Sequence, residues 1–174
     1  MNELVFYPLD KVDNGVIEGF SCGNPSIDTY FKTHYKARWD HRNALTSTTV
    51  VLYQGNAVAF FTSCCTQVKI SDEEVKALGS EVRHVPAVEV KFLAVHKGFQ
   101  GKGIGKHVIE AIVGDVYSFS RKFACRYIFL WSVPTEQALQ FYENRFFEDT
   151  NQVNSEGLHL MMFLVPDEIE LADE

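Results

Sequence analysis

A glycine-rich segment in the middle of the chain has the residue types that bind phosphate. It follows the apolar run Phe92–Val95 and precedes a periodic segment that starts at Ile104. The segment combines three glycines with two lysines: Gly101, Gly103, Gly105, Lys102 and Lys106. Glycine lets backbone N–H groups crowd around an anion, and the positive end of a following helix adds to the attraction. This pattern predicts a site for a phosphate or a diphosphate.

The spacing of the glycines excludes two common phosphate-binding loops. A Walker A loop needs G-x-x-x-x-G-K-[ST], but His107 follows Gly105-Lys106, so the hydroxyl that would hold magnesium is missing. A dinucleotide fingerprint reads G-x-G-x-x-G after an early strand, whereas this chain has G-x-G-x-G at mid-sequence. A glycine-rich turn without a ligand is the remaining alternative, which three glycines at a strand-to-helix junction disfavour.

The hexapeptide Gln100–Gly105 resembles the Q/R-x-x-G-x-G/A signature of the GNAT superfamily of N-acetyltransferases. Phe92–Val95 resembles the strand that leads into the pyrophosphate loop of that family, and the resemblance covers nearly the whole chain. It implies acetyl-CoA as cosubstrate, with an oxyanion held by a backbone N–H near Leu93 or Ala94. The cofactor-binding residues that it implies are Leu93, Ala94, Val95, Gln100, Gly101, Lys102, Gly103, Ile104, Gly105, Lys106, Thr135 and Tyr142.

A second segment, Ala138–Glu143, resembles the A-x-x-F-Y-E helix of the same family. In the family this tyrosine often protonates the departing CoA thiolate, so the resemblance implies that Tyr142 is a catalytic acid; a packing tyrosine is the alternative. Two positions depart from the family pattern. Thr135 stands where Asn is frequent, which weakens one expected cofactor contact. Arg145-Phe146-Phe147 replaces the usual Gly-Phe, which predicts a changed helix end.

An amine with a pKa of about 10.4 must lose a proton before or during attack. Glu89 is the candidate for the catalytic base, because its strand is similar to the one that carries a glutamate base in the histone-acetylating branch. Two alternatives stay open: a strand-end glutamate paired with Lys91 or Arg83, and a water relay. His84 and His96 flank the strand, where single histidines more often make structural hydrogen bonds than relay protons.

Periodicity and turn signals predict the order β-α-β-β-α-β-α-β-α-β-β. The expected strands are a segment within residues 4–20, followed there by a loop, and residues 48–53, 57–68, 85–95, 127–131, 147–152 and 158–165. The expected helices are residues 24–42, 71–79, 104–119 and 134–144, with Asn24 and Ser71 as the caps of the first two. The fold class is therefore α/β, a GNAT-like central mixed β-sheet with helices on both faces and a splay between the fourth and fifth strands. One acetyltransferase domain spans residues 1–166, followed by an acidic tail at 167–174.

Composition and charge bound the remaining possibilities. The net charge is −7, and removing the five acids of residues 167–174 leaves −2, so no global positive field is present. This charge argues against a nucleic-acid partner, although it does not exclude tRNA. No apolar run reaches the roughly 20 residues of a membrane span, and no signal peptide is evident. We therefore expect a cytoplasmic protein without a membrane partner. The four cysteines show no metal pattern, so no metal is expected, and a homodimer is the commonest oligomer.

The acceptor is the least determined part of the function. We expect an N-acetyltransferase that transfers the acetyl group to a primary amine of a small molecule, peptide or protein by direct attack in a ternary complex. Phe20–Pro25 resembles a segment of GNAT toxins that acetylate aminoacyl-tRNA, and the following helix interleaves basic and aromatic residues. We expect that helix to be an amphipathic cover for the sheet rather than an RNA-binding surface. Acetylation of aminoacyl-tRNA is the alternative, and a non-catalytic acetyl-CoA-binding or partner-docking module is a third reading.

Overall fold

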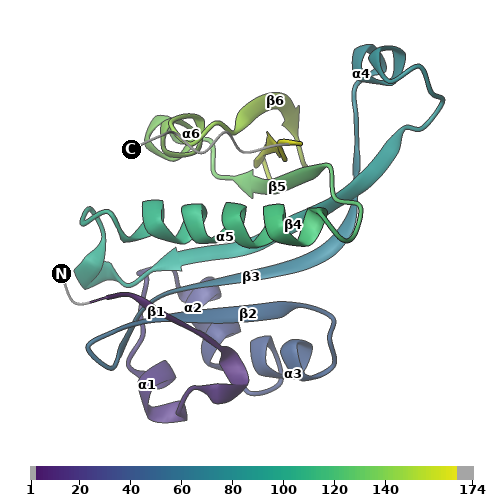
Figure 1. Ribbon diagram of the computed structural model, residues 1–174. Coiled ribbons are helices and arrows are strands. Elements are labelled where there is room, and N and C mark those ends of the chain that lie inside the picture. The colour runs from purple at the N-terminus through teal and green to yellow at the C-terminus, as the bar shows by residue number, and fades with distance from the viewer. Residues whose placement is uncertain (1–2, 168–174) are drawn as a thin grey trace, which may run out of the picture. The chain divides into compact units, whose positions relative to one another are not determined.

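The strands of the computed structural model, which describes residues 3–167, form a seven-stranded mixed β-sheet (Figure 1). The hydrogen-bonded strand order is β1-β2-β3-β4-β5-β7-β6. The β4–β5 pair is parallel, and the pairs β1–β2, β2–β3, β5–β7 and β6–β7 are antiparallel. The strands are Val5–Pro8 (β1), Ser47–Tyr53 (β2), Asn56–Lys69 (β3), His84–Val95 (β4), Tyr127–Ser132 (β5), Glu148–Val153 (β6) and His159–Leu164 (β7). This confirms the predicted fold class.

The chain divides into two compact units, and neither is continuous in sequence. The first comprises residues 1–64 and 90–111, and the second comprises residues 65–89 and 112–174. The strands β3 and β4 and the helix α5 (Ile104–Ser120) each contribute residues to both units. The predicted single domain at 1–166 stays a prediction, and all of the predicted acidic tail except Asp167 lies outside the described residues.

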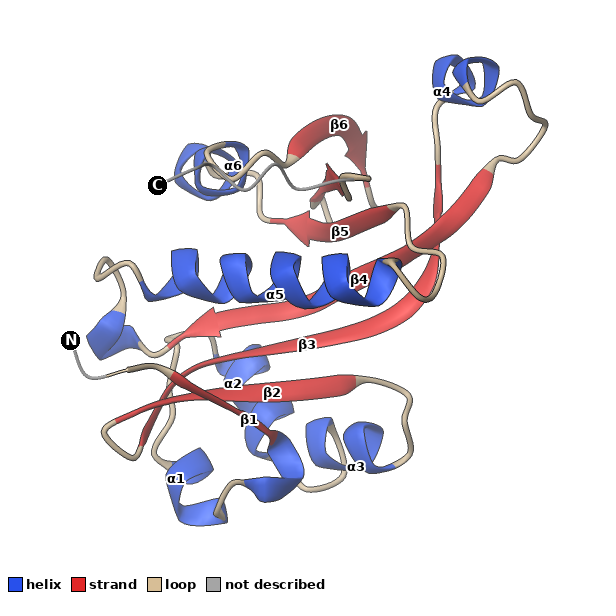
Figure 2. Ribbon diagram, viewed as in Figure 1, coloured by secondary structure: helices blue, strands red, loops and turns tan. Residues whose placement is uncertain are grey.

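The first unit packs short helices against the β1–β2–β3 part of the sheet (Figure 2). These are α1 (Asn14–Glu18), α2 (Pro25–Lys32) and α3 (Ala37–Arg42), with a 3-10 turn at Leu9–Lys11. Three aromatic rings anchor the core: Phe31 stacks on Phe60 at 4.0 Å between centroids, and Phe20 meets both rings edge-on. Burying each ring contributes about 1.5–3 kcal/mol.

Two expectations for this unit are wrong. Where a loop was expected, α1 forms, because the Asp13 side chain accepts a hydrogen bond from the Gly15 N–H and caps the helix. The helix expected over residues 24–42 is two helices. Asn24 caps the first one as predicted, but the backbone leaves the helical region at Thr33 (φ −77°, ψ 123°). β-Branched and aromatic residues, which lose side-chain freedom in a helix, occupy this stretch.

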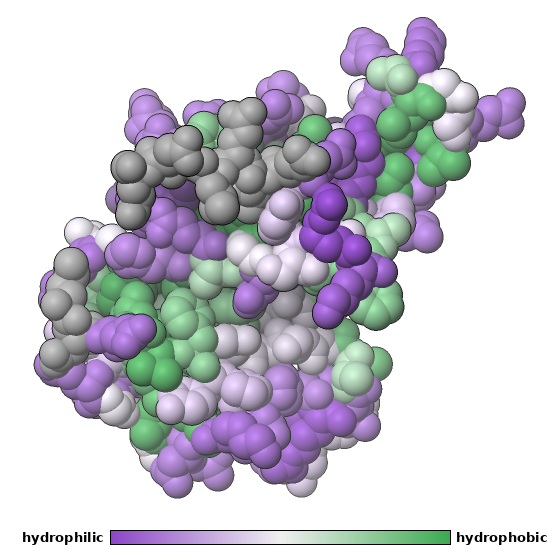
Figure 3. Space-filling model, in the orientation of Figure 1, coloured by the Kyte–Doolittle hydropathy of each residue, from purple (hydrophilic) through white to green (hydrophobic). Residues whose placement is uncertain are grey.

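The second unit contains β5, β7 and β6 together with α4 (Asp72–Ala77) and α6 (Glu136–Glu143). Ser71 caps α4 by accepting the Glu74 N–H, as its capping box predicts. The core beneath β5 and β7 is apolar: Val68, Ile70, Val85, Ala87, Phe129, Leu160 and Met162. Apolar side chains also gather in the α4 region (Figure 3), where Leu78 and Val82 are exposed. Across residues 3–167, helices long and apolar enough to cross a bilayer are absent.

The parallel pairing of β4 with β5 is short. It joins Ala87 to Tyr127, Val88 to Ile128 and Glu89 to Phe129. Within the described chain, the register stops there, although β4 continues to Val95. The β4 backbone beyond Glu89 is therefore not paired to β5, as the predicted splay between the fourth and fifth strands requires.

Candidate active site

The glycine-rich loop connects the end of β4 to the start of α5. A 3-10 turn at Lys97–Phe99 follows the strand, and α5 begins at Ile104. Gly101 has φ +74° and Gly103 has φ +83°, and a Cβ built on either residue would meet nothing within 4 Å. Both glycines are thus required by backbone conformation, and the main chain around them borders open space.

The first turn of α5 offers backbone donors to an anion. The N–H of His107 already bonds to the Gly103 carbonyl at 3.3 Å, but the first N–H groups of any helix have no acceptor within it. The aligned dipoles of this 17-residue helix place positive potential at the same end. Lys102 Nζ lies 5.0 Å from the Phe99 ring centroid, whereas Lys106 forms an exposed ion pair with Glu110 at 3.7 Å. The loop fits a diphosphate.

The Gln100 side chain braces the loop. Its Nε2 donates hydrogen bonds of 3.0 Å to the carbonyl oxygens of Cys22 and Val95. The Lys97 N–H donates to the Ser21 carbonyl at 2.8 Å. These contacts attach the Phe20–Asn24 segment to the loop and occupy the side-chain amide nitrogen of Gln100. Sequence reasoning missed this contact, because the 78-residue separation left no local signal.

His96 has a structural role that differs from the proton relay considered above. Its Nδ1 accepts a hydrogen bond of 3.0 Å from the Gly98 N–H, and its ring packs edge-on against Phe20 and Phe99. A neutral ring that accepts at Nδ1 carries its proton on Nε2. His84 is exposed at the start of β4.

The three β4 residues implied in cofactor binding lie just before the loop. Ala94 is buried, and Leu93 and Val95 are partly buried. All three belong to the part of β4 that is not paired to β5. Their backbone groups on the β5 side are therefore not engaged by that strand, although the Val95 carbonyl oxygen accepts a hydrogen bond from Gln100 Nε2. Unpaired backbone groups along a strand can bind an extended ligand.

Tyr142 lies on α6, in the second unit, with its ring packed edge-on against Phe141 and Phe147 at 5.0 and 5.8 Å. Within residues 3–167 its hydroxyl has no hydrogen-bond partner. Burial raises the pKa of Tyr142 to about 12, and the nearby Arg145 partly opposes this shift. The phenol is therefore protonated across the neutral range, as a proton donor must be.

The ends of α6 explain both departures from the family pattern. Thr135 Oγ1 accepts the Ala138 N–H at 3.3 Å and caps the helix, which therefore starts at Glu136 rather than at residue 134. At the other end, Phe146 adopts φ +65° with its side chain 84% exposed. This left-handed position is the one that glycine normally occupies after a helix.

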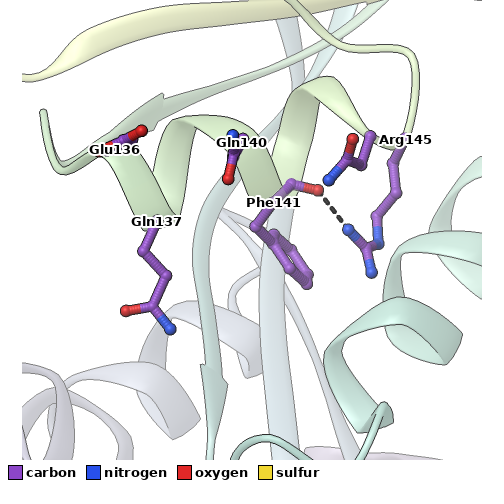
Figure 4. A pocket seen from close by; sticks show the side chains of 6 residues that line it. Glu136, Gln137, Gln140, Phe141 and Arg145 are labelled. Atoms are coloured by element: carbon purple, nitrogen blue, oxygen red, sulfur yellow. Dashed lines mark hydrogen bonds between the residues drawn. The ribbon is translucent and has the colours of Figure 1, made fainter.

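A shallow hollow of about 480 Å³ lies along α6 (Figure 4). The Arg145 guanidinium lies 3.9 Å from the Phe141 ring centroid and donates to the Phe141 carbonyl oxygen. The lining residues are Glu136, Gln137, Gln140, Phe141, Asn144 and Arg145. Tyr142 does not line this hollow, so the hollow is separate from the candidate acid.

Glu89 occupies the last residue pair of the β4–β5 register, opposite Phe129, and is partly buried. Arg83, one of its two considered partners, forms an ion pair with Asp72.

Burial raises the pKa of the thiols of Cys22 and Cys125, so neither has the lowered pKa of a reactive cysteine.

The predicted site residues fall into two groups. The loop and the end of β4 belong to the first unit, and Glu89, Thr135 and Tyr142 belong to the second. The first group supplies backbone N–H donors, and the second supplies the Tyr142 phenol and the Glu89 side chain, so the roles assigned to these residues stay predictions.

Comparison with known proteins identifies relatives of this chain. The model of the "Acetyltransferase (GNAT) family" matches residues 16–146. A tRNA-acetylating toxin of Mycobacterium tuberculosis (strain ATCC 25618 / H37Rv) is 26% identical over 148 residues, which cover 85% of this chain and 86% of the toxin.

Solved structures share the fold. AtaT complexed with acetyl-methionyl-tRNAfMet has a TM-score of 0.77 at 19% identity, covering 93% of this chain and 95% of that one. AtaTR bound with acetyl-CoA has a TM-score of 0.74 at 20% identity, covering 95% of each chain.

Proposed function

The chain belongs to the GNAT family and is an acetyl-CoA-dependent acetyltransferase, and we propose that its acceptor is the amino group of an aminoacyl-tRNA. The observation that carries this proposal is the similarity to a tRNA-acetylating toxin over 85% of the chain. The expected amine of a small molecule, peptide or protein is compatible with the family. The tRNA-acetylating relative favours the alternative acceptor, an aminoacyl-tRNA.

A local basic surface supports an RNA substrate. Residues 32–42 hold four Lys or Arg side chains and one acid, in a chain of net charge −7. Within the part of the chain that the structure describes, Lys36 and Arg42 make no ion pair. Their charges therefore remain available to phosphate groups, whose neutralisation supplies most of the non-specific affinity for nucleic acid.

Two exposed aromatic rings lie in the same segment. Tyr35 is 81% exposed, and Trp39 is 48% exposed. Exposed aromatic rings next to basic side chains stack on unpaired bases, and each stacked base contributes about 1–3 kcal/mol. The negative net charge of the whole chain does not disfavour RNA at this segment, because residues 32–42 carry the opposite charge.

The residues have separate roles in the proposed reaction. Acetyl-CoA supplies the acetyl group as a thioester. Backbone N–H groups of residues 101–106 hold its diphosphate at the start of α5, and Tyr142 donates a proton to the departing sulfur. Glu89 is the proposed base for the acceptor amine.

The test is transfer of radiolabelled acetyl groups from acetyl-CoA to purified aminoacyl-tRNAs, resolved by acid precipitation. We expect labelled aminoacyl-tRNA but no label on uncharged tRNA. A Tyr35→Ala/Trp39→Ala double variant should raise the KM for tRNA at least about tenfold. A matched double variant at other exposed aromatics, Tyr7→Ala/Phe123→Ala, should not raise it.

The same assay with free amines, peptides and proteins decides between the acceptor classes. Label confined to those acceptors, with none on any aminoacyl-tRNA, would contradict the proposal. If both acceptor classes are acetylated, the class with the higher kcat/KM is the preferred acceptor.

A further inference from the structure

Asp40 carries a partly buried carboxylate without a cationic partner. The Tyr30 hydroxyl donates a hydrogen bond to its Oδ2 at 3.2 Å. Across residues 3–167, no Lys, Arg or His side chain forms an ion pair with it. The adjacent His41 is engaged elsewhere, since its Nδ1 accepts the Thr48 N–H and its Nε2 lies 3.4 Å from Asp10. Charged groups withdrawn from water are usually paired with an opposite charge. The Asp40 side chain is instead held by a hydrogen bond from Tyr30 and has no ion-pair partner among the described residues.

Hydroxyl groups surround the same point. Thr46 is 8% exposed, and among residues 3–167 its buried Oγ1 has no hydrogen-bond partner. Thr62 is fully buried and shares a 2.8 Å hydrogen bond with Thr48. The Thr46 N–H donates to the Asp40 carbonyl oxygen at 3.4 Å, which places Thr46 next to Asp40. Burial raises the pKa of Tyr30, and its interactions with the Thr46 and Thr62 hydroxyls lower it. A carboxylate amid hydroxyl oxygens that can accept hydrogen bonds suits a positively charged group with several N–H donors.

The break between α2 and α3 creates this cluster. In a continuous helix, residues 30 and 40 would be separated by about 15 Å along the axis, beyond the reach of a hydrogen bond. The turn at residues 33–36 brings α3 back toward α2, and the Tyr30–Asp40 hydrogen bond joins the two helices.

The cluster also lies against β4. The Tyr30 ring packs on the Phe92 ring, with 4.4 Å between centroids. Phe92 directly precedes Leu93, the first residue proposed to hold acetyl-CoA, and both aromatic residues pack on the core that contains Ala94. All of these residues belong to the first unit.

We propose that Asp40, together with Tyr30 and Thr46, binds the ammonium group of the acetyl acceptor. A primary ammonium supplies three N–H donors and one positive charge, which match the carboxylate and the unpartnered hydroxyl. The proposal deepens the proposed function and rests on it for the identity of the acceptor. The reactive amine of an aminoacyl-tRNA is such a group in its protonated form.

The charge can be removed without removing the hydrogen bond. Asp40→Asn keeps an oxygen that accepts the Tyr30 O–H, and Thr46→Val keeps the shape of the side chain. The probes are glycinamide and methioninamide, titrated by calorimetry into the full-length protein saturated with CoA. We expect Asp40→Asn to weaken binding at least about tenfold, since it loses a charge-assisted hydrogen bond, and Thr46→Val to weaken it several-fold.

Controls separate binding from folding. Acetyl-CoA affinity and Tm should stay unchanged in Asp40→Asn, and Asp115→Asn, an exposed helical acid on α5, should bind the amides like the wild type. Equal affinity of the wild type and Asp40→Asn, or no saturable binding to the wild type, would overturn the proposal. If Asp40→Asn loses amide binding but the wild type acetylates no aminoacyl-tRNA, the ammonium subsite stands and only the proposed acceptor is overturned. If Asp40→Asn binds the amides and acetylates aminoacyl-tRNA like the wild type, the proposed acceptor stands and only the subsite is overturned.

Discussion

The side-chain nitrogen of Gln100 lies 3.0 Å from the carbonyl oxygen of Cys22, which precedes it by 78 residues. Through this hydrogen bond, the N-terminal segment that leads into α2 is attached to the candidate diphosphate loop. The position of the loop therefore depends on a part of the chain that does not itself bind the diphosphate.

We expect Gln100→Ala to weaken acetyl-CoA binding about three- to tenfold, because two hydrogen bonds that fix the loop are lost at about 1 kcal/mol each, partly replaced by water. Calorimetry with acetyl-CoA measures this change. Gln67→Ala, at an exposed position of β3, is the matched control and should bind like the wild type. Wild-type affinity in Gln100→Ala would show that the loop holds its shape without this brace.

Gly103→Ala tests the backbone requirement of the loop. The new Cβ would have room, so the expected cost is conformational, about 1–2 kcal/mol for a left-handed alanine. If the loop changes its conformation to avoid this cost, acetyl-CoA affinity falls at least tenfold. Gly114→Ala, in the middle of α5 and also with free space, should instead stabilise the protein by about 0.5–1 kcal/mol. Urea denaturation and calorimetry measure the two quantities, and similar effects of both substitutions would refute the argument.

Tyr142→Phe should lower kcat about 10²- to 10⁴-fold while leaving the affinity for acetyl-CoA within a factor of about three. Tyr127→Phe removes a phenol of equally high pKa, which is hydrogen-bonded to Glu74, and should keep the wild-type kcat. Unchanged turnover in Tyr142→Phe would assign that tyrosine to packing.

The raised pKa of Tyr142 also fixes a pH dependence. A folded-state pKa of about 12 lies above the ordinary tyrosine pKa of 10.0, so the phenol favours folding below pH 10, and this contribution is lost as the pH rises toward 12. Between pH 6 and 9 the phenol stays protonated, and any inflection of kcat in that window belongs to another group. An inflection between pH 6 and 9 that disappears in Tyr142→Phe would contradict this assignment.

Phe146→Gly should raise the free energy of unfolding by about 1 kcal/mol, because glycine adopts φ +65° without the steric cost that phenylalanine bears there. The exposed ring gives up little packing when it is removed. The comparison variant is Phe123→Gly, an exposed aromatic without a positive φ, which should not gain stability. A loss of stability in Phe146→Gly would mean that the exposed ring makes a contact that outweighs the strain.

Local signals predicted most of the elements. The Asn24 and Ser71 caps, the turn at Gln54-Gly55 and the apolar run at 127–131 each form as their residue types dictate. The glycine spacing predicted the loop before α5 for the same reason: left-handed backbone at Gly101 and Gly103 is a local property.

Contacts between distant residues were beyond such reasoning. Nothing near Asp40 in the sequence indicates that the helix breaks before it and brings it to Tyr30. The same holds for Gln100 and Cys22. It also holds for Asp40, which has no ion-pair partner among residues 3–167 because of the way α2, α3 and β2 pack together. Net charge was a poor guide to RNA binding for a related reason. It is a sum over the whole chain, whereas the basic segment is only 11 residues long.

Each compact unit is assembled from two separate stretches of chain. The chain passes from one unit to the other after residues 64, 89 and 111. A ribosome that has synthesised the first 89 residues has therefore completed neither of them, and the stretch that finishes the diphosphate loop is still to come. Expression of either half as an isolated fragment would yield an unfinished core. Genetic dissection of this enzyme must accordingly proceed by point substitution rather than by truncation.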